Sequence, residues 1–230
     1  MAKKKVLITV LAVALICVIA VAGTLAYLTD KANNGAGITN TFIAAGGGKL
    51  CEDFSIKETP VVQNPDGTYV KDPSASMSTS GIDYKVVPCA ELPKDPTLVI
   101  EGKTEVCAYL YFEVVNNLPT TIFEAPEYAD CWKKVDGVKG LNGGDVYVYS
   151  QKKAAPSTEY EPILITESKT DLKYQILKNN KIVVKNVDES TIAPISENAA
   201  DLKFYGYLGQ AKSGDNAKTV FEACEFVKVK

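Results

Sequence analysis

The stretch 106–116 limits the possible folds of this 230-residue chain more than any other. Apolar residues take alternate positions along it, and β-branched and aromatic residues are frequent. This period of two is typical of a strand, because successive side chains point to opposite faces of a sheet. We expect a central strand whose buried face consists of Val106, Ala108, Leu110, Phe112 and Val114. We interpret the other face as a second packing surface rather than a ligand platform; it carries Cys107, Tyr109, Tyr111 and Glu113.

Shorter alternating stretches recur along the chain, and turn-forming residues separate them. Many short strands with frequent turns predict an all-β fold, an antiparallel β-sandwich with short helical insertions. The best helix candidate is 216–224, with Asp215 or Asn216 as its N-cap. Trp132, the only tryptophan, is expected in the core. The expected strands are 39–44, 50–56, 83–88, 131–135, 145–150, 161–166, 172–177, 182–187 and 201–211.

Turn signals connect several of these strands. Asn179 and Asn180 tolerate positive φ and lie between two alternating stretches, which predicts a hairpin. Residues 136–137, Asp-Gly, predict another turn. The segment 58–81 is rich in Pro, Ser, Thr and Asp and contains the turn signal 65–67. We expect it to be a long surface excursion with at most one short hairpin.

The first 26 residues have the three parts of a secretory signal. Three lysines at 3–5 form a cationic head, 6–22 is an unbroken apolar run, and Thr24 and Ala26 are small enough for a cleavage site. We place the cut between Ala26 and Tyr27, so that no stable membrane anchor remains. An uncleaved anchor is the alternative, because the run approaches the length that spans roughly 30 Å of hydrocarbon. The small residues, and the lack of basic residues just after the run, favour cleavage.

Three stretches resemble the TasA and camelysin proteins of Gram-positive bacteria, which are exported by the SipW-type signal peptidase. The first, LAYLTDKANNGAGITNTFIAAG (25–46), has an aromatic residue after the cut, an aspartate, a polar gap and Asn-Thr-Phe. The second, YKVVPCAELPKDPTLVI (84–100), includes a Lys-Asp-Pro connection at 94–96 that we expect to pass the chain between opposite sheets; Cys89 stands where the family usually has glycine. The third, LKFYGYLGQAKSGDNAKTVFEAC (202–224), resembles the family's closing strand and short helix; Gly206 and Leu208 depart from the pattern.

This resemblance implies a signal peptide at 1–26, an extended arm at 27–48 and a jelly-roll-like sandwich at 49–230. It also implies a secreted structural protein, a subunit of extracellular biofilm-matrix or surface fibres. We hypothesise that the freed arm of one copy pairs with an exposed sheet edge of another copy or of a related matrix protein. Packing of the arm on its own domain is the alternative. The proposed donor residues are Tyr27, Leu28, Asp30, Ile38, Phe42 and Ile43.

Histidine is absent, which excludes Ser-His-Asp and Cys-His catalysis and HExxH zinc sites. We therefore expect no catalytic residues, no metal ligands and no cofactor, although a calcium site built from loop oxygens stays open. A monomeric surface adhesin or binding module is the main alternative function, and a camelysin-like metal-dependent protease is less favoured. Loss of the leader's three lysines changes the net charge from −3 to about −6, and an acidic surface argues against nucleic acid as a partner.

Five cysteines follow the predicted cleavage site, and none has the CxxC spacing of a metal or thioredoxin-like site. Because the number is odd, at least one is free or pairs between chains. Two interpretations stay open: buried, reduced cysteines, or one or two disulfides. The candidates are Cys51, Cys89, Cys107, Cys131 and Cys224.

Overall fold

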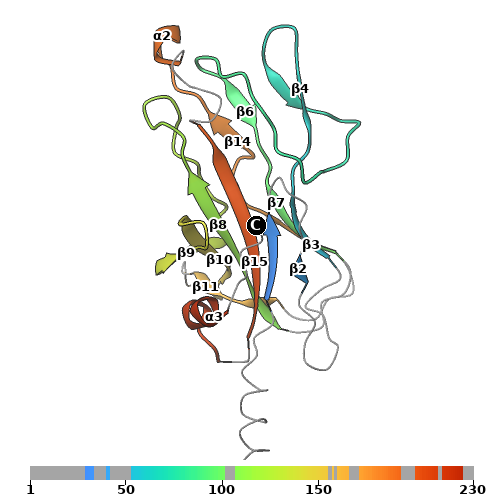
Figure 1. The fold of residues 1–230 in the computed structure, drawn as a ribbon, viewed down its shortest axis with the longest axis vertical. Coiled ribbons are helices and arrows are strands. Elements are labelled where there is room, and N and C mark those ends of the chain that lie inside the picture. Colours follow the sequence, from blue (N-terminus) through green and yellow to red (C-terminus); the bar gives the residue numbers. More distant parts are fainter. Residues whose placement is uncertain are drawn as a thin grey trace, which may run out of the picture.

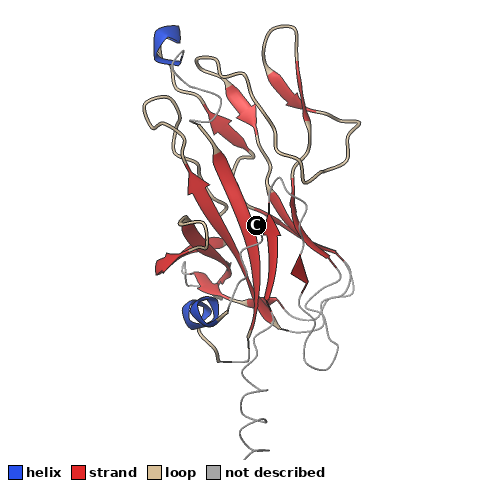
Figure 2. Ribbon diagram, viewed as in Figure 1, coloured by secondary structure: helices blue, strands red, loops and turns tan. Residues whose placement is uncertain are grey.

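The computed structural model describes residues 29–33, 40–41, 53–101, 107–154, 157, 160–165, 171–192, 200–211 and 214–224. These residues form antiparallel sheets with little helix (Figure 2), which confirms the predicted all-β class. Within these ranges, no helix has the length and apolar character needed to cross a membrane. The predicted signal peptide at 1–26 and its cleavage site lie outside the described residues.

The largest sheet is centred on two long strands that pair along their whole length (Figure 1). β8 confirms the strand predicted at 106–116, and β15 confirms the one predicted at 201–211. From edge to edge the order is β11, β10, β8, β15, β1 and β2, while β12 also pairs with β8 and β9 with β10. Their bounds are β1 (Thr29–Asn33), β2 (Asn40–Thr41), β8 (Ala108–Asn116), β9 (Trp132–Lys139), β10 (Asp145–Lys152), β11 (Tyr160–Pro162), β12 (Leu164–Ile165) and β15 (Leu202–Gln210).

The remaining ladders lie on the other side of the core. β3 (Asp53–Lys57), β7 (Thr97–Glu101) and β13 (Leu172–Gln175) form a three-stranded sheet, and β6 (Glu91–Pro93) pairs with β14 (Lys181–Val183). The ladders β6–β14 and β7–β13 join the same two chain segments. The 94–96 connection is tight as predicted, but it continues along one partner segment instead of passing between facing sheets.

The hairpin predicted at Asn179 and Asn180 is wrong. The strands on either side of this turn pair with β7 and β6 and not with each other. Lys94 N donates to Asn180 O at 2.8 Å and Ile176 N donates to Pro96 O at 2.9 Å, so the turn is an outward excursion within one long ladder. Asn180 does take a positive φ of 52°, but non-local pairing decides where its flanking strands go.

The turn predicted at 136–137 is also wrong. β9 continues through these residues to Lys139, and its register with β10 shifts there. Gly137 has a φ of 74°, so the Asp-Gly signal is used by a bulge rather than by a hairpin. The chain reverses instead at 140–143, where Gly143 N donates to Gly140 O at 3.0 Å.

The predicted surface excursion at 58–81 contains one hairpin, as expected. Its strands are β4 (Val61–Gln63) and β5 (Tyr69–Lys71), and Gly67 closes the turn with a φ of 89°. The hairpin projects beyond the body of the sheets (Figure 1). Val62 and Val70 lie opposite each other on it and are 43% and 42% exposed.

The main core lies between the large sheet and the three-stranded sheet. Phe54 and Leu98 of the smaller sheet belong to the same buried cluster as Phe112 and Phe204 of the larger one. Burial of such apolar surface stabilises the fold by roughly 25 cal/mol per Å². Trp132 is 4% exposed, its ring meets that of Phe112 edge to face, and its Nε1 donates to Gln175 O at 2.8 Å, which confirms the prediction that it is a core residue.

The opposite face of β8 is covered by helix α3 (Ala217–Ala223). Asn216 is its N-cap, because its side chain accepts a hydrogen bond from Lys218 N. Tyr111 is fully buried, and its hydroxyl donates to Ala217 O at 2.8 Å. The tyrosines of this face are therefore packing residues, as predicted. The other described helix, α2 (Glu189–Ile192), is a single turn.

Candidate functional site

The edge of the large sheet is completed by the N-terminal segment. β1 pairs antiparallel with β15 from Thr29 opposite Gly209 to Asn33 opposite Tyr205, and β2 folds back on β1. Of the proposed donor residues, Asp30 lies in β1. The others, Tyr27, Leu28, Ile38, Phe42 and Ile43, lie outside the described residues, as does Ala26.

One end of β15 extends beyond this pairing. β8 covers β15 from Leu202 to Gln210, whereas β1 covers only Tyr205 to Gly209. In the part of the chain that the structure describes, no strand pairs with residues 202–204 on the β1 side. An edge of this kind presents backbone N–H and C=O groups to an added strand.

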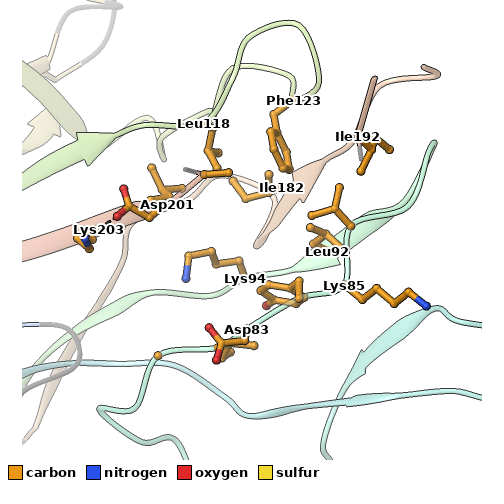
Figure 3. A pocket seen from close by; sticks show the side chains of 16 residues that line it. Asp83, Lys85, Leu92, Lys94, Leu118, Phe123, Ile182, Ile192, Asp201 and Lys203 are labelled. Atoms are coloured by element: carbon orange, nitrogen blue, oxygen red, sulfur yellow. Dashed lines mark hydrogen bonds and ion pairs between the residues drawn. The ribbon is translucent and has the colours of Figure 1, made fainter. Parts of the chain in front are cut away.

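A cleft of about 970 Å³ lies beside this open edge (Figure 3). Leu202 and Lys203 of β15 lie on one side, and residues 81–86 lie on another. Apolar side chains dominate the remainder of the lining: Leu92, Leu118, Phe123, Ile182 and Ile192. A cleft with apolar side chains next to a partly uncovered strand edge is suited to an extended peptide, which offers both backbone groups and apolar side chains.

The strand predicted at 83–88 is wrong, and this segment forms a wall of the cleft instead. Lys85 N donates to the hydroxyl oxygen of Tyr69 at 2.8 Å, and the Tyr84 hydroxyl donates to Pro93 O. Side-chain contacts therefore hold the segment where a ladder was expected. Exposed and half-buried residues alternate from Asp83 to Val86, but the backbone partners of a strand are absent from the described structure.

A largely buried ionic cluster lies next to the cleft, which Lys94 lines. Lys94 Nζ contacts both carboxylate oxygens of Glu58, at 2.8 and 3.0 Å, and the two side chains are 9% and 0% exposed. Asp95 accepts hydrogen bonds from the backbone and hydroxyl of Thr59, both at 2.8 Å, and pairs with Lys71 at 2.8 Å. The cluster thus ties the start of the excursion to the connection between β6 and β7.

Sequence reasoning identified the Lys-Asp-Pro segment only as a connection and missed this burial. The charged pair Lys94 and Asp95, enclosed between Pro93 and Pro96, was the available signal. The charges of the cluster neutralise one another in pairs, so it is best understood as a structural tie. Among the described residues, no group of three or more His, Cys, Asp or Glu side chains is placed to hold a metal ion, and the calcium site stays an untested prediction.

Glu113 is a second buried carboxylate with several donors. It accepts hydrogen bonds from Gly144 N at 2.8 Å, Asn142 N at 2.9 Å, Asn142 Nδ2 at 3.0 Å and the Tyr207 hydroxyl. Burial and the nearby Glu113 carboxylate raise the pKa of Tyr207. A Cβ at Gly140 would lie 2.1 Å from Glu113 Cδ, so the turn between β9 and β10 closes directly on this carboxylate. We interpret Glu113 as a turn anchor, since its oxygens are already engaged.

The four described cysteines are free thiols. Cys89 and Cys107 are exposed, Cys131 is half-buried, Cys224 is buried, and Cys51 lies outside the described residues. Burial raises the pKa of Cys131, and it raises that of Cys224 to about 12, which keeps both thiols protonated at neutral pH. Cys89 has a φ of 59°, a left-handed conformation that favours glycine.

No family model matches this chain, and no curated protein or solved structure is significantly similar to it. The resemblance to the TasA and camelysin proteins therefore rests on its three sequence stretches. The structure brings described parts of all three together. β1, from the first stretch, pairs with β15, from the third. Lys85, Leu92 and Lys94, from the second stretch, line the same cleft as Leu202 and Lys203, from the third.

Proposed function

We propose that this chain is a secreted structural protein whose copies assemble into extracellular fibres by N-terminal strand addition. The pairing of β1 with β15 is the single observation that supports this best, because the arm and not the body supplies that edge strand. In this proposal residues 1–26 are a cleaved signal peptide, 27–48 are the arm, and 49–230 are a jelly-roll-like antiparallel β-sandwich. The protein acts through self-association and not as an enzyme.

The exchange of arms between copies would link the copies into an assembly. The ladder between β1 and β15 spans five residue pairs within one copy, and the same ladder forms equally well between two copies. Exchange of an identical element is a low-cost route to association, and a head-to-tail contact that does not close gives a filament. Residues 42–52 lie between β2 and β3 in the sequence and include three consecutive glycines at 46–48.

The cleft gives the exchanged arm a reason to prefer a neighbour. Within one copy the arm reverses between β1 and β2. If an arm from a neighbour continued straight in the same register, residues 34–36 would lie opposite 204–202 on the open edge of β15. The following residues, including Ile38 and Phe42, would then reach the apolar cleft. Burial of these side chains in the cleft would favour the addition of a neighbour's arm.

Electron microscopy of the mature protein tests the proposal. Protein that starts at Tyr27 is expected to form fibres, and protein from which 27–37 has been deleted is expected to stay unassembled, since it lacks β1. A synthetic peptide of residues 27–44 should then bind to the deleted protein with one-to-one stoichiometry. Fibres that form as readily without the arm would overturn the role of strand addition.

A monomeric binding module is the second candidate, and the cleft is the observation that favours it. A single copy has the cleft, and its own arm already covers most of the edge of β15. Light scattering over time separates the two functions, because a fibre subunit grows in mass and an adhesin does not.

A further inference from the structure

Residues 81–86, which we name the strap, have the sequence of a strand without the pairing of one. Ile82, Tyr84 and Val86 are half-buried, while Asp83 and Lys85 are exposed, so the alternation of a strand persists. Tyr84 and Val86 pack against the edge of the main core. In the described structure, Lys85 N is the sole backbone group of the strap with a hydrogen bond, and its partner is a side chain. The strap is thus a strand-forming segment held beside the cleft without a ladder.

Two tyrosines hold the strap in place. The Tyr84 hydroxyl donates to Pro93 O of β6, and its ring meets that of Tyr69 edge to face with centroids 5.1 Å apart. The Tyr69 hydroxyl oxygen in turn accepts the hydrogen bond from Lys85 N. These few contacts are the polar attachments of the strap, so the loss of one hydroxyl should weaken its hold measurably.

The strap and Lys94 of the ionic cluster line the same cleft. Burial, and then the carboxylates of Glu58 and Asp95, raise the pKa of Tyr84. Its hydroxyl therefore stays a protonated donor across the physiological pH range. Release of the strap would bring more water to Lys94, which lines the cleft, and so to its pair with Glu58.

We propose that the strap is a gate over the acceptor cleft, with Tyr84 as its latch. This inference rests on the proposed function and adds a control to the same site. When the latch is closed, the strap restricts access to the open edge at 202–204. When an arm arrives and Tyr84 releases Pro93 O, the unpaired backbone of the strap becomes available to pair with the far side of the incoming strand. The arm would then lie between β15 and the strap.

The rate of fibre formation by matched tyrosine variants tests the gate. Tyr84→Phe removes the hydroxyl of the latch and keeps the ring, and Tyr69→Phe removes the acceptor of Lys85 N. A hydrogen bond of this kind contributes enough that each variant should shorten the lag before assembly by about two- to tenfold. Tyr174→Phe is the control, since its half-buried ring meets Tyr149 away from the strap. It should keep the wild-type lag.

Hydrogen exchange of residues 81–86 in the unassembled protein gives a second measurement. Both strap variants should exchange faster there than wild type, with unchanged exchange in β8 and β15. If wild-type protein assembles but Tyr84→Phe assembles at the same rate or more slowly, the gate is wrong and the fibre proposal stands. If wild-type protein does not assemble, both proposals fail. Should Tyr84→Phe not fold by circular dichroism, Tyr69→Phe decides the question by the same criteria.

Discussion

Helix α3 and the strap both cover β-structure, but different interactions hold them. α3 buries Val220 and Phe221 against Tyr111 and Tyr207, which are themselves fully buried. The strap places half-buried side chains beside the cleft and depends on two hydroxyls. Apolar covering of the first kind opens only when the whole sheet does, whereas a segment with few buried contacts opens locally. Helix α3 therefore stays closed over the sheet, whereas the strap is able to move.

The largest loss of stability is expected in the aromatic core beside β8, where apolar burial is most complete. Phe112→Ala should lower the free energy of unfolding by about 3–5 kcal/mol, because Phe112 stacks on Tyr147 and meets Trp132 and Phe204. Denaturant unfolding measures this loss. Val62→Ala, at an exposed site, should change stability by less than about 0.5 kcal/mol. Equal effects at the two sites would contradict the assignment of the core.

The next largest loss of stability is expected in the ionic cluster beside the cleft. Glu58→Ala should cost about 3 kcal/mol, because it leaves the buried ammonium of Lys94 without its partner. The double variant Glu58→Leu with Lys94→Met should recover most of that loss in denaturant unfolding. Glu91→Ala breaks a more exposed pair with Lys181 and should cost less than about 1 kcal/mol. A double variant as unstable as the single one would show that the charges themselves are needed.

A smaller change, a gain of stability, is expected at Cys89, shortly after the strap. Cys89 adopts a left-handed conformation that favours glycine. Cys89→Gly should therefore raise the free energy of unfolding by about 1 kcal/mol, partly offset by the greater freedom of glycine in the unfolded chain. Cys89→Ala removes the thiol but keeps the Cβ, so it should bring no gain. A gain by alanine would assign the effect to the thiol instead of the backbone.

The smallest effect concerns the surface of the large sheet. Lys134 and Lys139 each contact Asp145 at 2.7 Å and lower the pKa of its carboxyl. A carboxyl whose pKa is lower in the folded state stabilises the fold above its unfolded pKa of about 3.9, and this contribution is lost as the pH falls through the folded value. Asp145→Asn should lose less than about 1 kcal/mol at pH 7 and nothing at pH 2. A loss that persists at pH 2 would exclude the charge as its cause.

Local sequence signals predicted the helix and strands whose conformation does not depend on which distant segment pairs with them. The alternation at 106–116 predicted β8 and both of its faces, and Asn216 predicted the start of α3. The errors at 83–88, 136–137 and 179–180 share one cause. Each pattern was real, as the positive φ of Gly137 and Asn180 shows, but distant segments decided the use made of it.

The candidate site shows the same division. The Lys-Asp-Pro connection and part of the arm were identified from the sequence, because they lie in the stretches that resemble a family. The contact of Lys94 with Glu58, and of Tyr84 with Pro93, joins residues whose types carry no local signal of their partners. The cleft lies between segments that such contacts position, so no single stretch could have predicted it.

The pairing of β1 with β15 has a consequence for biogenesis. The strand made first joins one that is made almost last, so the large sheet cannot be finished until nearly the whole polypeptide has been synthesised. Contacts between such distant segments form slowly, since a long loop must close before any of them is gained. If the chain is exported as proposed, this slow completion of the sheet would keep it unfolded during passage through a translocation pore.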